Sequence, residues 1–295
     1  MGKKILKKEN GNRAICKLFY QNKPFFVSRF GTTELSVVCW NLFKNKQTQK
    51  NFPKDLKKNI SVLSGFYPSD NTNMKKFAEM FVSKLNQIDI LGVRWESFDQ
   101  CFWENEAKIL KEHCVHTKLC GIEVVGLPFL FKNSWIKKLQ NRKVLIIHPF
   151  KESIKKQFLR KKLWNKHIGL PKLRPIFLKA EQSLANEKTK SPYRSWFEAL
   201  DSMCKKIEKI DFEIALIGAG AYGLFLGAHC KKIGKSAIHV GGALQLFFGI
   251  KGKRWTEKTS PDHIPKKVWK SGWVWPLPSE VPQGAQSVEN ACYWK

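Results

Sequence analysis

Short runs of apolar, often β-branched residues alternate along the chain with longer segments in which apolar residues recur every three or four positions. The short runs predict buried strands at 24–30, 88–93, 118–125, 143–149, 176–178, 212–217 and 236–240, with 60–70 as strand or loop. The longer segments predict helices at 33–43, 74–86, 104–113, 151–166, 196–210 and 224–233. This alternation predicts an α/β fold, with a mostly parallel sheet flanked by helices on both faces and related to the Rossmann fold.

The pattern contains no internal repeat, and we expect a single domain over residues 1–295. Residues 12–130 form its N-terminal half, and residues 140–250 form a half that carries a glycine-rich turn. Residues 251–295 are rich in proline, tryptophan and lysine and have little periodicity. They predict an irregular tail that packs over the body of the domain.

The charge of the chain is strongly unbalanced, with 53 basic and 24 acidic residues and a formal net charge of +29. Such an excess indicates an anionic partner: nucleic acid, an acidic membrane surface or a phosphorylated substrate. Between 132 and 179, fifteen lysines or arginines accompany one acid, Glu152. A polybasic face there favours attachment to anionic lipid. The alternative is an ordinary solvated face in a protein whose lysine content reflects genome composition.

The cysteines and the apolar runs indicate the cellular compartment of the protein. The eight cysteines have neither CxxC spacing nor histidines at zinc-ligand intervals, so we expect reduced core cysteines. No run of 18 apolar residues is present, which argues against a membrane span, and residues 1–10 lack the apolar stretch of a secretory signal. We therefore expect a cytoplasmic protein that attaches peripherally to the inner membrane face.

A glycine-rich turn, Gly218-Ala219-Gly220-Ala221-Tyr222-Gly223, joins the predicted strand to the predicted helix that begins at 224. In that context a GxGxxG pattern indicates nucleotide binding, because glycines let the backbone approach a pyrophosphate and free amides at a helix start bind its charge. Gly241 and Gly242 follow the next strand and would extend the same phosphate cradle. The alternative is that these glycines only allow close packing of strand and helix.

A nicotinamide cofactor fits this sequence less well than a nucleoside diphosphate. A strand that binds a dinucleotide usually ends in an acid that contacts the ribose, about twenty residues after the glycines. The corresponding strand here ends in His239-Val240-Gly241-Gly242, without a carboxylate. His148 and His239 each end an apolar strand, where a buried core histidine is a more common role than a catalytic one.

Other candidate residues lie near the first predicted strand and in an aromatic-rich segment around residue 100. Arg29 is placed to bind phosphate, with a structural ion pair as the alternative. Glu34 could contact a metal or an acceptor hydroxyl, or only favour the start of its helix. Arg194, just before a predicted helix, is a candidate to close over phosphate. A general base is expected among the carboxylates Glu96, Asp99 and Glu104.

Four segments resemble GT-D-type glycosyltransferases of bacterial polysaccharide clusters. They are 28–35, with Arg29-Phe30-Gly31-Thr32-Thr33-Glu34, then 215–223, 238–245 and the closing Glu289-Asn290-Ala291-Cys292-Tyr293-Trp294. The resemblance brackets residues 25 to 294 and implies a GT-D-like domain that transfers a sugar, with inversion, from a nucleotide-diphosphate donor. It also implies that Arg29, Gly31, Thr32 and Thr33 contact this donor.

The family pattern Arg-Phe-Gly-Asp-x-Glu carries two acids that help to bind the donor and a divalent metal. Thr32 stands at the aspartate position, so only Glu34 of the two acids remains. One carboxylate binds Mg²⁺ or Mn²⁺ less firmly than two, although a hydroxyl and donor phosphates can complete the coordination. This difference weakens the expectation of a metal cofactor, and basic side chains could neutralise the leaving diphosphate instead.

These features predict a glycosyltransferase that moves a sugar from a nucleotide-sugar donor to a glycan or lipid-linked acceptor in surface polysaccharide synthesis. The charge and eleven tryptophans make a nucleic-acid-binding protein the first alternative, although no recognition-helix, zinc-finger, RRM or KH signature is present. A nucleotide-binding oxidoreductase is the second alternative.

Overall fold

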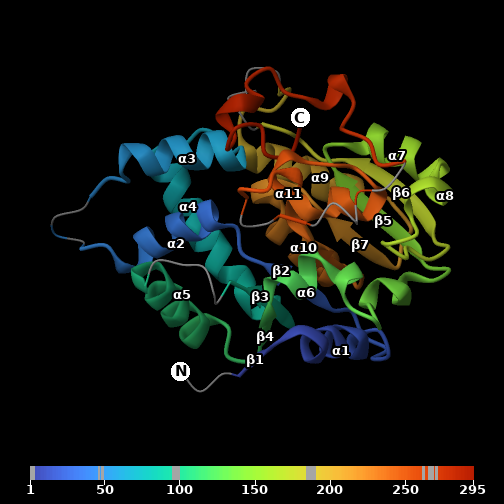
Figure 1. Cartoon of the computed structure of the whole chain (residues 1–295). Helices are drawn as coiled ribbons and strands as arrows, with labels where there is room; N and C mark the ends of the chain where they lie inside the picture. The colour runs from blue at the N-terminus through green and yellow to red at the C-terminus, as the bar shows by residue number, and fades with distance from the viewer. Residues whose placement is uncertain are drawn as a thin grey trace.

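A computed structural model of the chain describes residues 4–45, 47, 50–94, 100–183, 191–260, 263–264, 269 and 272–295. Its centre is one parallel sheet with the strand order β1-β4-β3-β2-β8-β7-β5-β6 (Figure 1). The predicted α/β fold with a parallel sheet is thereby confirmed. The strands are β1 (Ile5–Leu6), β2 (Phe26–Arg29), β3 (Ile90–Val93), β4 (Lys118–Gly121), β5 (Lys143–His148), β6 (Arg174–Lys179), β7 (Ile214–Ile217) and β8 (Ser236–His239).

Helices cover both faces of this sheet and enclose a separate hydrophobic core on each (Figure 1). The first face carries α2 (Thr32–Phe43), α3 (Lys54–Ser64), α4 (Asn71–Lys84), α5 (Gln100–His113), α9 (Trp196–Glu208) and α10 (Gly223–Lys232). The second carries α1 (Lys8–Leu18), α6 (Ile122–Gly126), α7 (Lys151–Leu159) and α8 (Lys161–Trp164). Within the described residues, no helix is both long enough and apolar enough to span a bilayer.

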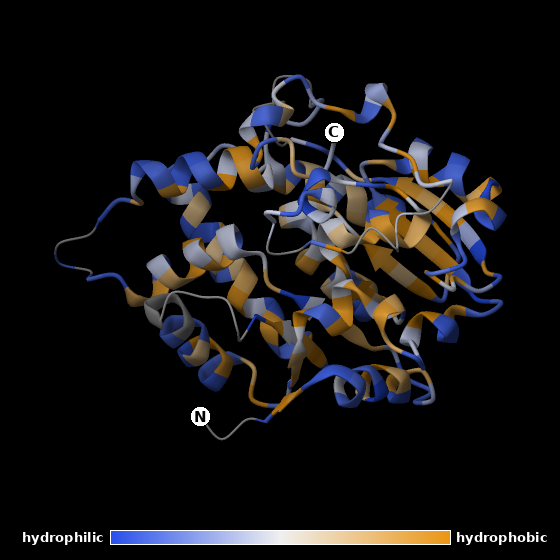
Figure 2. Cartoon of the chain, in the orientation of Figure 1, coloured by the Kyte–Doolittle hydropathy of each residue, from blue (hydrophilic) through white to orange (hydrophobic). Residues whose placement is uncertain are grey.

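Side chains alternate between the two cores along each central strand, as the two-residue period of a strand requires. In β7, Ala215 and Ile217 belong to the first core, whereas Ile214 and Leu216 belong to the second. Since both faces are covered, such strands are apolar at every position, and they form the hydrophobic centre of the molecule in Figure 2. This is why short continuous apolar runs were sufficient to locate them.

Residues 60–70 were expected to form a strand or loop; residues 60–64 instead end the helix α3, whereas 65–70 form a loop as expected. Leu56, Ile60 and Leu63 have the spacing of one helix face, which the sequence analysis overlooked. Gly65 then ends the helix in the left-handed conformation, with a φ of 75°.

Three other elements differ from those predicted from the sequence. Residues 8–18 form α1, a helix that was not predicted because the segment is polar overall and buries only Ile15 and Leu18 among its large apolar side chains. The strand expected over 118–125 ends at Gly121, where the chain turns into α6. The helix expected over 151–166 consists of two helices, α7 and α8, that break at Arg160.

The segments that follow β2 and β8 leave the sheet toward opposite faces. Strand β2 leads into α2, whose Leu35 packs in the first core. Strand β8 leads into a 3-10 segment, η6 (Gly241–Phe248), whose Leu244 packs in the second. The two strands are neighbours, and ligands of open α/β sheets bind where adjacent strands diverge in this way. A topological switch point therefore lies just beyond Arg29 and His239.

The tail after residue 252 contains the short helix α11 (Lys253–Thr256) and the 3-10 turns η8 (Pro278–Glu280) and η9 (Ala285–Ser287). Irregular segments connect them across the body of the domain (Figure 1). Glu280 attaches it to the start of α7. The Glu280 carboxylate accepts hydrogen bonds from the amides of Glu152 (2.8 Å) and Ser153 (3.3 Å), and from the Ser153 hydroxyl. These are amides of the first helical turn, which have no partner within the helix itself.

Glu280→Ala should therefore lower the free energy of unfolding by about 1–3 kcal/mol, because it leaves buried amides at the start of α7 without an acceptor. The control is Glu79→Ala, which removes only an exposed ion pair with Lys75 and should cost less than about 0.5 kcal/mol. Urea denaturation measures both. Equal losses in the two variants would show that Glu280 does not fix the tail.

Candidate functional site

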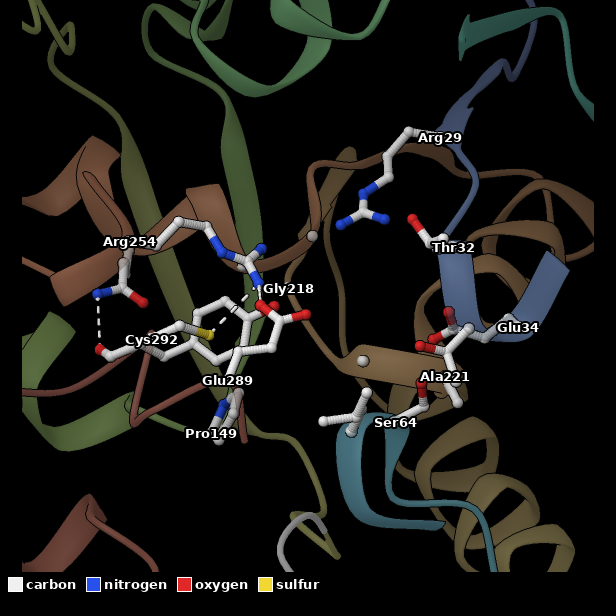
Figure 3. Close-up of a pocket in the computed structure, with 18 of the residues that line it drawn as sticks. Arg29, Thr32, Glu34, Ser64, Pro149, Gly218, Ala221, Arg254, Glu289 and Cys292 are labelled. Carbon is white, nitrogen blue, oxygen red and sulfur yellow. Dashed lines mark hydrogen bonds and ion pairs between the residues drawn. The ribbon is translucent and has the colours of Figure 1, made fainter. Parts of the chain in front are cut away.

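A cavity of about 360 Å³ lies at the switch point, beyond the carboxyl ends of β2, β5, β7 and β8. The starts of α2 and η6, the glycine turn and the C-terminal tail form its walls. Figure 3 shows Arg29, Thr32 and Glu34 on one side and Arg254, Glu289 and Cys292 on the other. Ten residues proposed from the sequence line it together: Arg29, Gly31, Thr32, Thr33, Glu34, Gly218, Gly220, Ala221, Gly241 and Gly242.

The first turn of α2 brings free backbone amides and a carboxylate to this cavity. Gly31 precedes the helix in an extended conformation, so Thr32 and Thr33 lie in the first turn, where amides have no intrahelical acceptor. The Glu34 carboxylate folds back against Gly31: an added Cβ at Gly31 would lie only 1.8 Å from Glu34 Oε2. Glu34 is mostly buried and forms no ion pair with a cation of the described chain.

Arg29 ends β2 and lies between the two strands of the switch point. Its guanidinium donates a 2.6 Å hydrogen bond to the carbonyl of Phe30. Burial lowers the pKa of Arg29, while Tyr293 and Glu34 act in the opposite direction. Gly241 makes room for this side chain, because a Cβ at that position would lie 2.7 Å from Arg29 Nε, and its φ is 74°. A partly desolvated cation of this kind favours an anionic ligand.

The glycines of the turn after β7 have different roles. Gly220 has a φ of 49° and lines the cavity beside Ser64, so it requires a residue that adopts the left-handed region. Gly223 instead allows close packing, since an added Cβ would lie 2.2 Å from His239 Nε2. Tyr222 points into the core, where it stacks on Trp196 with ring centroids 5.0 Å apart. Close packing of strand and helix therefore accounts for Gly223, whereas Gly220 lines the cavity and its part in nucleotide binding stays a prediction.

The wall opposite Arg29 comes from the tail and contains an arginine that the sequence analysis did not identify. The Arg254 guanidinium forms an ion pair with Glu289, donates to Cys292 Sγ at 3.3 Å and lies 4.9 Å from the centre of the Tyr293 ring. The backbone that carries these partners has positive φ values at three consecutive residues, Glu289, Asn290 and Ala291. No periodic pattern links Arg254 to Glu289 along the sequence, so only the folded tail reveals the pair.

The cavity is lined by more cations than carboxylates in the described chain. The cations are Arg29, Arg94, Lys253 and Arg254, and the carboxylates are Glu34, Glu257 and Glu289. Burial lowers the pKa of both lining histidines, His148 and His239, to about 3, so they are neutral at physiological pH. The Phe150 amide donates to His148 Nδ1 at 2.9 Å, and Ser28 Oγ lies 3.3 Å from His239 Nδ1.

Several candidate residues lie elsewhere. Arg194 is exposed before α9, where its amide donates to Glu198 Oε2 at 2.7 Å, and it does not line the cavity. Glu104 is exposed on α5 and also lies outside it. Glu96 and Asp99 fall outside the described residues.

Glu106, on the inner side of α5, is a buried acid that the sequence analysis passed over. It is 2% exposed, and its Oε2 has no hydrogen-bond partner among the described residues. It lines a small cavity together with Gly31, Thr32 and Arg94, residues that also line the main cavity. Burial raises the pKa of Glu106 to about 7, and the nearby Arg94 acts against this shift. Its place about two turns from either end of α5 gave no chemical signal in the sequence.

The lining offers few ligands for a divalent metal. Glu34 supplies one carboxylate and Thr32 one hydroxyl, and no group of three histidine, cysteine, aspartate or glutamate residues gathers within the described chain. A Mg²⁺ or Mn²⁺ ion usually takes six or more oxygen ligands. These residues therefore fit such an ion only when phosphate oxygens of a ligand complete its coordination.

The fold is similar to that of a solved domain of unknown function, and two further solved chains with the same domain name align at lower scores. A selenomethionine-substituted structure of domain of unknown function 1792 (DUF1792) superposes with a TM-score of 0.51 at 14% identity, over 94% of this chain and 92% of that one. A second DUF1792 structure, described as having a distinct glycosyltransferase fold, gives 0.49 at 13% identity over 94% and 92%. A third, described as a new glycosyltransferase (DUF1792) from Streptococcus sanguinis, gives 0.41 at 13% identity over 96% and 97%.

No protein-family model matches the chain, and no curated protein matches it in sequence. The likeness to the first DUF1792 structure therefore shows a shared fold, and fold does not by itself determine function.

Glu106 should make stability depend on pH. Because the folded-state pKa of about 7 exceeds the ordinary 4.5, the folded chain binds more protons between these values, and stability falls as pH rises through them. In Glu106→Gln, the fall in the free energy of unfolding between about pH 4.5 and pH 8 should be smaller than in the wild type by about 3 kcal/mol. Urea denaturation across that range measures it. The control Glu104→Gln should leave the pH dependence of the free energy of unfolding unchanged. If Glu106→Gln also leaves it unchanged, Glu106 lies in a solvated site.

Proposed function

We propose that the chain is a glycosyltransferase that binds a nucleoside-diphosphate sugar in the cavity at the switch point. The observation that carries this proposal is the convergence of four anion-binding features on one cavity. These are Arg29, the first turn of α2, the turn at 218–221 and Arg254. Each of these features occurs alone in many proteins. Together they suit a ligand with two phosphates, such as a diphosphate, better than a ligand with a single anionic group.

In the proposed reaction, a hydroxyl of the acceptor attacks the anomeric carbon of the sugar from the side opposite the diphosphate. The new carbon–oxygen bond forms as the bond to the β-phosphate oxygen breaks, so the configuration is inverted. The leaving diphosphate keeps the bonding electrons, and Arg29 and Arg254 stabilise its added charge. Glu34 is the proposed general base that takes the hydroxyl proton, because it is the lining carboxylate without an ion-pair partner in the described chain.

The proposed acceptor is a glycan or a lipid-linked glycan of surface polysaccharide synthesis, as the sequence resemblance implies. Aromatic side chains near the cavity support a carbohydrate ligand, since sugars pack on aromatic faces. Tyr293 lines the cavity with one ring edge against Gly242, where an added Cβ would lie 2.2 Å from Tyr293 Cε1.

A divalent ion would be held by Glu34 and Thr32 with the donor phosphates, and it would supply positive charge to the leaving diphosphate. In that arrangement Glu34 would be a metal ligand, and another group would have to accept the acceptor proton. The two arginines already supply such charge from within the chain. We therefore propose that donor binding depends on the arginines more than on metal.

Arg254→Gln should weaken binding of UDP or GDP about tenfold or more, because it removes a charge-assisted hydrogen bond to phosphate. Isothermal titration calorimetry measures the affinity, with NAD as a comparison ligand. The matched control is Arg194→Gln, which removes the same charge at an exposed site outside the cavity and should leave affinity unchanged. Equal effects of both variants would mean that the cavity is not the diphosphate site.

Thr32→Asp should tighten Mn²⁺ binding in the presence of UDP, because it adds a second anionic oxygen ligand beside Glu34. Mn²⁺ titration followed by electron paramagnetic resonance measures free metal directly. Thr32→Asn is the control, since it has the same shape without the charge. If the Asp and Asn variants bind Mn²⁺ equally, the start of α2 does not face the diphosphate.

A further inference from the structure

A second feature of the molecule lies outside the cavity, on the surface formed by α7 and α8. Leu159 is 81% exposed and Leu163 is 52% exposed, although both are large apolar side chains. They are four residues apart at the junction of the two short helices. Five exposed cations surround them in the sequence: Lys155, Lys156, Arg160, Lys162 and Lys166. We call these seven residues the α7–α8 surface.

The core does not need these two leucines. Ile154, Trp164 and Ile168 already fill the space between α7–α8 and the second core, with exposures of 0 to 2%. Gln157 fixes the position of α7 through hydrogen bonds to the carbonyls of Gly249 (3.1 Å) and Gly272 (2.9 Å). Leu159 therefore projects into solvent, whereas Leu163 is half-exposed beside Gly272 of the tail, where an added Cβ would lie 2.6 Å from Leu163 Cβ.

The surrounding cations are available to an external anion. None of the five forms an ion pair with an acid of the described chain. The one acid of this segment, Glu152, lies at the start of α7 next to Lys151, 3.7 Å from its ammonium group. The surface thus combines unneutralised positive charge with exposed aliphatic side chains, which is the composition of segments that bind at a membrane interface.

We propose that the α7–α8 surface docks on an anionic lipid bilayer, with Leu159 and Leu163 inserted below the headgroups and the five cations on lipid phosphates. Nucleic acid would use the cations but would have no use for exposed leucines. A second copy of the chain would place like charges against each other, which opposes association. The bilayer is the partner that uses both parts of the surface.

The position of this surface relates it to the cavity. Helix α7 begins directly after Pro149 and Phe150, which line the cavity, and ends at Leu159. A helix of nine residues is about 14 Å long, so docking would hold the cavity close to the lipid headgroups. Delivery of a lipid-linked acceptor by this route rests on the proposed glycosyl transfer, whereas docking itself does not.

The test is sedimentation of the full chain with vesicles of phosphatidylcholine, with and without phosphatidylglycerol. The protein should bind only the anionic vesicles, and binding should weaken as salt rises. Leu159→Ser should reduce partition about tenfold, because an inserted leucine is removed. Leu130→Ser changes a leucine that is 54% exposed on a different element, and it should have no effect.

The charge is tested separately by the double variant Lys155→Glu with Lys162→Glu, which should reduce partition more than about tenfold. Its matched control, Lys54→Glu with Lys58→Glu, makes the same change in net charge on exposed positions of α3. Equal losses in both double variants would show only a response to net charge and would overturn the proposal. So would wild-type binding by Leu159→Ser, or equal binding to neutral vesicles.

A short oligonucleotide provides the remaining contrast. Two results together would make the surface a nucleic-acid site and overturn the proposal. The first is that the oligonucleotide binds the chain and that Lys155→Glu with Lys162→Glu abolishes this binding. The second is that Leu159→Ser leaves vesicle binding unchanged. UDP affinity should be the same in every variant of the surface. A loss of vesicle binding with intact UDP binding therefore separates this proposal from the proposed function.

Discussion

The guanidinium of Arg29 occupies the space that a side chain at position 241 would fill, and the cavity is arranged around this contact. Glycine at 241 lets the ends of β2 and β8 approach each other while the chain leaves them toward opposite faces of the sheet. The same contact keeps a cation partly desolvated at the switch point. Charge there acts through a lower effective dielectric than at the surface, so a bound anion is attracted more strongly.

The fold could be predicted from the sequence because its central strands are buried on both sides. The centres of two predicted runs, 144–147 and 214–217, are apolar at every position, and short runs bounded by turn residues are specific enough to be recognised. The two-residue strand β1 and the polar helix α1 carry too few apolar residues to give such a signal. They form because tertiary contacts, such as pairing of β1 with β4, compensate for weak local preference.

The candidate site could be predicted only where its parts are local in sequence. The segment from Arg29 to Glu34 and the turn at 218–221 each connect a strand end to a following helix, so their position follows from the local pattern. Arg254 and Glu289 meet because the tail is held to α7 by Glu280, a contact between residues more than a hundred positions apart. No periodicity records such a contact. Arg194, by contrast, had a plausible local setting but faces solvent.

The tail wall has a consequence for motion. Glu289, Asn290 and Ala291 have φ values of 46°, 55° and 60°, and left-handed backbone costs each non-glycine residue about 1–2 kcal/mol. Packing opposes release of the segment, because Ala291, Cys292 and Trp294 are buried in one small cluster with Phe150, just before α7. Displacement of the wall that carries Arg254 would therefore expose this cluster to water, and the hydrophobic cost of that exposure offsets the backbone strain.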